Sequence, residues 1–242
     1  ACNIVFPYIF IGMPNILHIE TSTSVCSVAL SGDTEMKCHF ENYEGPSHAS
    51  VLGVFVQKAV DFVREKGMKL DAVAVSAGPG SYTGLRIGVS EAKGLCFGLD
   101  IPLIALDTLK IMACGVLFRN FYDEDVLYCP MIDARRMEVY TAVYDTAFNE
   151  IRPITAQVVE ENTFDDLLES HQILFFGNGA EKCKSLIQHP NARFLAHVHP
   201  LAMDMQALAD KAYKEGDFAD VAYFEPFYLK DFVATKPKNK VF

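Results

Sequence analysis

A glycine-rich turn between an apolar strand and a helix is the segment of this sequence best suited to bind a charged ligand. The strand at 72–76 is followed by GPGSYTGLRIG, where Gly78 and Gly80 permit positive φ angles or the close approach of a neighbour. Ser81 or Thr83 can cap the next helix, whose free N–H groups would attract phosphate or carboxylate. A tight connection without a ligand explains the same residues equally well. The expected anion- or nucleotide-facing loop comprises Gly78, Gly80, Ser81, Thr83 and Arg86.

Other catalytic or metal-binding patterns are weak. The turn matches neither Gly-x-Gly-x-x-Gly nor the P-loop pattern, and Ser81 lacks the Gly-x-Ser-x-Gly elbow of a serine nucleophile. His197 and His199, with His189 nearby, resemble a metal pair, but Pro200 follows and no carboxylate has suitable local spacing. We therefore expect no catalytic residue and no metal ligand.

The helix after the turn carries small residues at four-residue intervals. Gly84, Gly88, Ala92 and Cys96 therefore lie on one face and form a nearly continuous ridge. An interior glycine costs about 1 kcal/mol relative to alanine, so two on one face require a packing reason. The ridge either packs closely on the chain's own sheet or contacts a helix of another subunit.

The elements that must position these residues form two similar halves. The first half is predicted to contain strands at 15–20, 25–31 and 35–41, a helix over 47–66, the strand and helix around the turn, and a strand at 102–105. After a helix over 108–118, the order repeats with strands at 126–132, 137–144, near 151 and at 173–176, and with short helices after 163 and 179. This order predicts a duplicated α/β fold with mixed sheets flanked by helices.

Composition favours a reduced, acidic, cytoplasmic protein. The 21 Lys and Arg against 31 Asp and Glu give a net charge of −10, which disfavours autonomous binding to nucleic acid. The seven cysteines are scattered and include no Cys-x-x-Cys pair, as is typical of cytosolic thiols. Residues 1–12 are apolar but too short to span a membrane, so we interpret them as an N-terminal extension or an additional edge strand.

Several segments carry a family resemblance across nearly the whole chain from Asn15 onward. The segments ILHIETSTSVCSVAL, GPGSYTGLRIG, IPLIALDTL, IDARRMEVY and PFYLKDFVATK together resemble the bacterial TsaB (YeaZ) family. The resemblance implies an actin-like (ASKHA), duplicated ribonuclease-H-like fold. It divides the chain into an N-terminal subdomain over 1–106, a C-terminal subdomain over 107–221, and a tail over 222–242 that packs back on the first.

The resemblance also implies a partner role. Members of this family are understood as non-catalytic subunits that bind and activate the TsaD-type transferase for threonylcarbamoylation of the tRNA adenosine next to the anticodon. The implied partners are the TsaD paralogue in a heterodimer, the TsaE ATPase and, when the chain is alone, a second copy; tRNA is reached only through the complex. The implied subunit interface uses the helix after the turn and comprises Gly84, Leu85, Gly88, Val89, Glu91, Ala92 and Cys96.

Two departures argue against catalysis by this chain. TsaD-type paralogues carry a His-x-x-x-His metal pair where this sequence has Thr108 and Met112, which are poor ligands for such a metal. The first hairpin of actin-like proteins brings an Asp and a glycine to Mg-nucleotide, whereas residues 20–23 read ETST. We expect no cofactor in this chain itself, with ATP or ADP confined to a composite interface with the partner. A metal- or ATP-dependent enzyme of glycoprotease-like or kinase-like type is the alternative.

A charged cluster in IDARRMEVY has two interpretations. Asp133, Arg135 and Glu138 lie between two predicted strands, where a solvated hairpin turn is the simpler explanation. The other is a polar cluster that faces the interdomain cleft or a partner. The family resemblance does not decide its chemistry.

Overall fold

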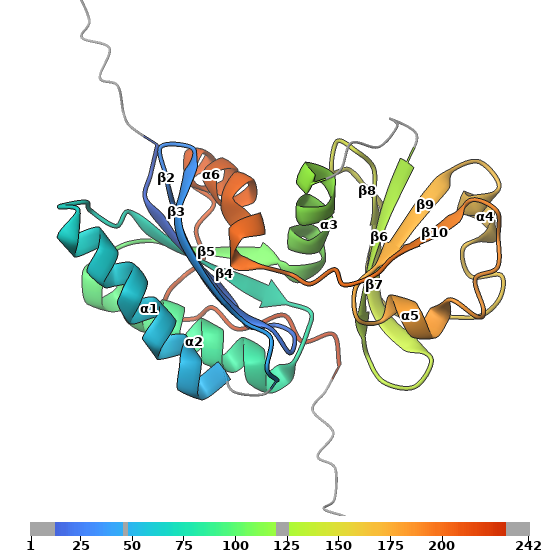
Figure 1. The fold of residues 1–242 in the computed structure, drawn as a ribbon, viewed down its shortest axis with the longest axis horizontal. Coiled ribbons are helices and arrows are strands. Elements are labelled where there is room, and N and C mark those ends of the chain that lie inside the picture. The colour runs from blue at the N-terminus through green and yellow to red at the C-terminus, as the bar shows by residue number, and fades with distance from the viewer. Residues whose placement is uncertain (1–12, 46–47, 120–125, 231–242) are drawn as a thin grey trace, which may run out of the picture.

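Each half of the chain is built on a mixed five-stranded sheet (Figure 1). The computed structural model describes residues 13–45, 48–119 and 126–230, so residues 1–12 and the end of the tail lie outside the described residues. The first sheet has the order β3-β2-β1-β4-β5. Its strands are β1 (Ile16–Glu20), β2 (Cys26–Gly32), β3 (Glu35–Asn42), β4 (Ala72–Gly78) and β5 (Leu103–Asp107).

The second sheet repeats the first. Its order, β8-β7-β6-β9-β10, places an antiparallel meander beside two parallel strands, as in the first sheet. Its strands are β6 (Val126–Asp133), β7 (Glu138–Tyr144), β8 (Glu150–Val158), β9 (Gln172–Phe176) and β10 (Ala192–Leu195). The predicted duplicated α/β fold, with mixed sheets flanked by helices, is confirmed.

Two long helices cover one face of the first sheet. They are α1 (His48–Glu65) and α2 (Tyr82–Leu99), which lie side by side in Figure 1. Because successive strand residues point to opposite faces, Val73 and Val75 of β4 face these helices, while Ala72 and Ala74 pack on the other side. The central strands β1 and β4 are therefore buried on both faces, and they hold the glycine-rich turn rigidly at the end of β4.

The helices around the second sheet are shorter. The outer ones, α4 (Asp165–Leu168) and α5 (Ala180–Cys183), contain 4 residues each. The helix α3 (Thr108–Arg119) lies between the two sheets in Figure 1. Its Leu109 and Met112 join the apolar cluster of the second half, whereas Ile111 joins a cluster of the first. This helix therefore ties the two halves together.

The chain returns to the first half earlier than the sequence suggested. The 3-10 helix η1 (Ala202–Met205) and the helix α6 (Gln206–Glu215) were not predicted, and neither was β10. Ala209 and Ala212 of α6 pack on the first sheet, so residues from about 201 onward do not belong with the second half. The expected division at 221/222 therefore differs from the structure, in which η1 and α6 already pack on the first sheet.

The last described segment, residues 219–230, runs back along the first half. The N–H of Ala219 donates to the carbonyl of Leu103 on β5 at 2.8 Å. Lys93 Nζ of α2 donates to the carbonyls of Ala222 and Phe224 at 3.2 and 2.9 Å. We call residues 219–230 the C-terminal strap, because it crosses the first half without helix or strand structure of its own.

Candidate functional site

The glycine-rich turn is held against the hairpin turn that joins β1 and β2. Ser81 caps α2, because its Oγ accepts the N–H of Gly84 at 3.2 Å. The Ser81 N–H donates to the carbonyl of Ser22 at 2.6 Å. A Cβ at Gly80 would overlap the same carbonyl, so only glycine permits this approach. The N-terminus of α2 is thus fixed in place by backbone contacts within the chain.

Gly78 serves the C-terminal strap. Its φ of +114° is a conformation that other residues rarely adopt, and a Cβ there would lie 2.6 Å from the carbonyl oxygen of Phe227. The N–H of Phe227 also donates to the carbonyl of Ala77 at 2.7 Å. The strap therefore occupies the space beside Gly78 where a ligand was expected.

A cleft of about 970 Å³ separates the turn from the second half. Of the residues assigned to the anion-facing loop, Gly80, Ser81 and Thr83 line this cleft, whereas Gly78 and Arg86 do not. Arg86 instead lies over the ring of Tyr82 at 5.4 Å and donates to its hydroxyl at 3.2 Å. The opposite wall includes Ile132, Asp133, Ala134, Arg135, Arg136, Glu138, Tyr140 and Asn178.

The charged cluster of the β6–β7 turn faces this cleft. Asp133 Oδ1 accepts the N–H of Arg135 at 2.9 Å and pairs with Lys182 of α5. Lys182 also donates to the carbonyls of Arg136 and Glu138, both at 2.7 Å. The cluster is therefore both a braced hairpin turn and a lining of the cleft, so the two interpretations of the sequence are compatible.

Two further residues that hold this wall come from distant parts of the chain. Asn178 Oδ1 accepts the N–H of Asp133 at 2.9 Å, and Lys230 of the C-terminal strap pairs with Glu138. Sequence reasoning missed both, and it missed Lys182 as well. Their separation from the turn exceeds 40 residues in each case, so no local pattern indicates the contact.

The small-residue ridge of α2 packs on its own hairpin. A Cβ at Gly84 would overlap the carbonyl of Thr21, and one at Gly88 would overlap Thr21 Oγ1. The Thr21 hydroxyl in turn donates to the carbonyl of Gly84 at 2.8 Å. Ala92 and Cys96 are buried in the apolar cluster beneath the helix. Gly84 and Gly88 therefore leave the space that Thr21 fills.

This packing corrects the choice of interface residues. Six of the seven are buried within the chain, and only Glu91 is partly exposed, so the expectation that this face meets another subunit is wrong. The periodicity correctly placed these small residues on one face of α2. It did not show that this face is turned toward the chain's own sheet. The buried six are Gly84, Leu85, Gly88, Val89, Ala92 and Cys96.

The opposite side of the helical pair has glycines that no contact within the described residues requires. A Cβ at Gly53 of α1, or at Gly94 or Gly98 of α2, would have no atom within 4 Å among the described residues. Large apolar side chains accompany them, because Val54 is 52% exposed and Phe97 is 85% exposed. We call these five residues the outer face of α1 and α2.

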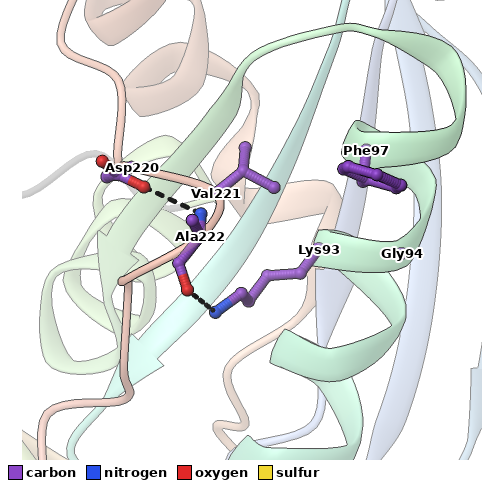
Figure 2. A pocket seen from close by; sticks show the side chains of 6 residues that line it. All are labelled: Lys93, Gly94, Phe97, Asp220, Val221 and Ala222. Carbon is purple, nitrogen blue, oxygen red and sulfur yellow. Dashed lines mark hydrogen bonds between the residues drawn. The ribbon is translucent and has the colours of Figure 1, made fainter.

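A shallow hollow adjoins this outer face (Figure 2). Its volume is about 550 Å³, and it lies between the end of α2 and the C-terminal strap. Figure 2 shows Lys93 reaching the carbonyl of Ala222, with the ring of Phe97 and the side chain of Val221 nearby. Phe97 is exposed, whereas Val221 is partly buried against the apolar cluster of the first half. The lining residues are Lys93, Gly94, Phe97, Asp220, Val221 and Ala222.

The residues that the sequence offered as metal ligands make packing or hydrogen-bond contacts within the chain. Thr108 and Met112 are buried, and Met112 belongs to the apolar cluster of the second half. His199 lies edge-on to Tyr43 with ring centroids 5.7 Å apart, and His189 Nδ1 accepts the N–H of Asn191 at 3.2 Å. Within the described ranges, no group of three or more His, Cys, Asp or Glu is arranged to hold a metal.

One acidic side chain of the first hairpin is deeply buried. Glu20 ends β1 with no exposure, and its Oε1 accepts the N–H of Ser22. Burial raises the pKa of this carboxyl from 4.5 to about 7, because the charged form loses its hydration. Glu20 is therefore a structural acid beneath the cleft, with Ser22 between it and the cleft.

Comparison with known proteins identifies the family. The family model described as "TsaD: tRNA N6-adenosine threonylcarbamoyltransferase" matches residues 43–238. The tRNA threonylcarbamoyladenosine biosynthesis protein TsaB of Escherichia coli is 32% identical over 227 residues, which cover 91% of this chain and 96% of that protein. The chain belongs to the TsaB family. The Bacillus subtilis TsaB protein is 30% identical over 89% of this chain and 93% of its own length.

Solved structures of the TsaB family have the same fold. YeaZ from Pseudomonas aeruginosa superposes with a TM-score of 0.75 at 28% identity, covering 90% of this chain and 100% of that one. The actin-like, ribonuclease-H-like architecture implied by the sequence is thus confirmed for both halves. No helix in the described part of the chain is long and apolar enough to cross a membrane.

Proposed function

We propose that this chain is a non-catalytic subunit that binds and activates a TsaD-type transferase for tRNA threonylcarbamoylation. Membership of the TsaB family supports the pathway, since the relatives' names place them in tRNA threonylcarbamoyladenosine biosynthesis. The proposal places the complex in the cytoplasm, where it meets tRNA through the transferase. The outer face of α1 and α2 is the observation that carries the partner role.

The outer face has the properties of a helix-packing surface. Each glycine in a helix interior costs about 1 kcal/mol relative to alanine. Among the described residues, no atom lies where a Cβ of Gly53 or Gly94 would need a glycine to make room, so nothing there justifies that cost. A partner helix would justify it, because a missing Cβ lets two helices approach closely. The exposed rings and methyl groups of Phe97 and Val54 supply the apolar area that such contacts bury.

The two halves differ in the length of their helices, which favours a single helix-packing interface per chain. The helices α1 and α2 contain 18 residues each, whereas their counterparts α4 and α5 contain 4 each. Only the first half therefore offers a long helical pair. We infer that this pair meets the transferase in the heterodimer, and a second copy of this chain when the transferase is absent.

Catalytic groups are assigned to the partner. The positions equivalent to a TsaD-type histidine pair hold the buried Thr108 and Met112, which supports a division of labour between the two paralogues. Under this proposal, ATP or ADP and the TsaE ATPase act at the composite surface that forms when the two subunits meet. Metal-free, isolated chain is then expected to show no transferase or peptidase activity of its own.

Binding to the transferase tests the proposal. Gly94→Leu and Phe97→Ala alter the outer face without touching the buried ridge. The control Ala207→Leu places a leucine at an exposed site on α6. We expect each outer-face variant to weaken binding in calorimetry about tenfold or more, as for central interface residues, and the α6 variant to bind normally. Wild-type affinity in both outer-face variants would refute this interface.

Product formation then tests the function itself. We expect reconstituted threonylcarbamoylation of tRNA to need this chain and to fall in parallel with affinity in the Gly94→Leu variant. If the transferase, the adenylate-forming enzyme and the ATPase make equal product without this chain, the activator role is wrong. Retained product formation with the Ala207→Leu control would show that a leucine added to an exposed helix position does not by itself abolish activity.

A further inference from the structure

We propose that the C-terminal strap is a latch that crosses the cleft and limits how far the two halves of the chain can separate. The strap contributes Phe227, Tyr228, Leu229 and Lys230 to the lining of the cleft. It therefore reaches the space between the halves, although its earlier residues pack on the first half. All of these contacts lie within one chain, so the inference does not depend on the proposed partner role.

Two neighbouring residues of the strap fasten it to the first half. The N–H of Phe227 donates to the carbonyl of Ala77 in β4 at 2.7 Å. The ring of Tyr228 packs on the ring of Tyr82 in the first turn of α2, with the ring centroids 4.7 Å apart. Because β4 is buried on both faces and α2 packs along the sheet, these two residues have a rigid support. They form the first anchor of the latch.

Lys230 fastens the strap to the second half. Its ammonium group pairs with the carboxylate of Glu138, the first residue of β7. Among the ion pairs of the described residues, this pair alone joins a segment bound to the first sheet with a strand of the second. The backbone at Glu138 is itself held, because its carbonyl accepts a hydrogen bond from Lys182 of α5 at 2.7 Å. The ion pair is therefore the second anchor of the latch.

The link between the two anchors is short. Only Leu229 separates Tyr228 from Lys230, and two residue steps of backbone span at most about 7 Å when fully extended. The link contains no helix that could unwind to give more length. Beyond the reach of the Lys230 side chain, the two walls of the cleft therefore cannot separate here while both anchors hold.

The second anchor is the one that can release. The side chain of Lys230 is 37% exposed and that of Glu138 is 22% exposed, so water and dissolved salt compete with their attraction. The other connection between the halves is the helix α3, whose apolar side chains pack on both. Release of Lys230 therefore leaves both sheets intact and lets the cleft of about 970 Å³ widen, with α3 as the hinge.

Pulsed electron-resonance distance measurements on the full-length chain test the latch. Spin labels attached through a genetically encoded ketone amino acid at Thr83 and Arg135, on opposite walls of the cleft, leave the native cysteines unmodified. We expect Lys230→Ala to lengthen and broaden the distribution of distances between the labels. The matched control Lys37→Ala removes a lysine from an ion pair with Glu35 inside the first half, and we expect it to leave the distribution unchanged.

Exchange of the two charges separates the ion pair from other effects of the lysine. Lys230→Glu alone should lengthen the distance as Lys230→Ala does, and the addition of Glu138→Lys should restore the distance of the unmodified chain. Because salt screens exposed charges, a high NaCl concentration should lengthen the distance in the unmodified chain but not in Lys230→Ala. Failure of the exchanged pair to restore the short distance would overturn the role of this contact.

A longer link tests the geometry of the latch. Insertion of two glycines between Tyr228 and Leu229 keeps both anchors but lengthens the backbone between them, so we expect longer and broader distances. Far-UV circular dichroism should match the unmodified chain in every variant, because neither sheet loses a contact. An unchanged distribution in Lys230→Ala or in the insertion variant, or equal lengthening in the Lys37→Ala control, would overturn the proposal.

Discussion

Gly88→Ala and Gly94→Ala make the same chemical change six residues apart on α2, yet we expect opposite effects on stability. At Gly94 a Cβ would meet no described atom within 4 Å. The replacement should stabilise the isolated chain by about 1 kcal/mol, the usual helical advantage of alanine over glycine. At Gly88 the Cβ would overlap Thr21 Oγ1, whose hydroxyl donates to the carbonyl of Gly84.

The cost at Gly88 follows from that contact. Overpacking in a tight interior costs about 1–3 kcal/mol, and displacing the Thr21 hydroxyl leaves a buried group unsatisfied at about 1–3 kcal/mol more. After the helical gain of about 1 kcal/mol is set against these losses, we expect Gly88→Ala to destabilise by about 2 kcal/mol. For a chain of this size that lowers the melting temperature by roughly 4–8 °C.

Urea denaturation followed by circular dichroism measures both variants at one protein concentration. The Thr21→Ala background provides the decisive comparison, because it removes the Oγ1 that the new Cβ would overlap. In that background Gly88→Ala should become stabilising, as Gly94→Ala is in the unmodified chain. If Gly88→Ala stabilises the unmodified chain, or remains equally damaging without the Thr21 hydroxyl, the account of the ridge as an intrachain packing surface is wrong.

Two further predictions concern Glu20 and the C-terminal strap. Because burial raises the pKa of Glu20 to about 7, the folded chain holds a proton that the unfolded chain has released, and stability falls as pH rises from about 4.5 to about 7. Glu20→Gln should remove this part of the pH dependence in urea midpoints, and an unchanged slope would contradict the assignment. Lys93→Met should speed hydrogen exchange at the Phe227 N–H by releasing the carbonyls of Ala222 and Phe224, with exchange in β4 unchanged as the control.

Local patterns were sufficient to predict most of the fold. Alternation and apolar runs located the strands within one or two residues, except the strand near 151 and β10, which was not predicted. The serine of the turn was correctly identified as one of two candidate caps of α2. These signals are local, since a strand's period and a helix cap depend on neighbouring residues. The helix α6 was not predicted, although its apolar residues do recur at helical spacing. Those that pack on the first sheet are Leu208, Ala209, Ala212 and Tyr213.

The contacts that decide the candidate sites are not local. Four-residue spacing placed Gly84 and Gly88 on one face, but only the position of Thr21 in space shows that this face is already occupied. Lys182 and Lys230 reach the β6–β7 turn across more than 40 and 90 residues, respectively. A single sequence has no signal for such pairs, because their spacing depends on how the two halves are assembled.

The duplication explains why two different surfaces arise from one repeated topology. The β1–β2 turn and the β6–β7 turn occupy equivalent places in the two sheets. The first is buried by α2, so Thr21 and Ser22 have no exposure, whereas short α5 leaves Arg135 and Arg136 exposed. Long helices in one half therefore bury their own turn and leave an outer face exposed. Short helices in the other half leave the equivalent turn open, and its charged residues can face the cleft.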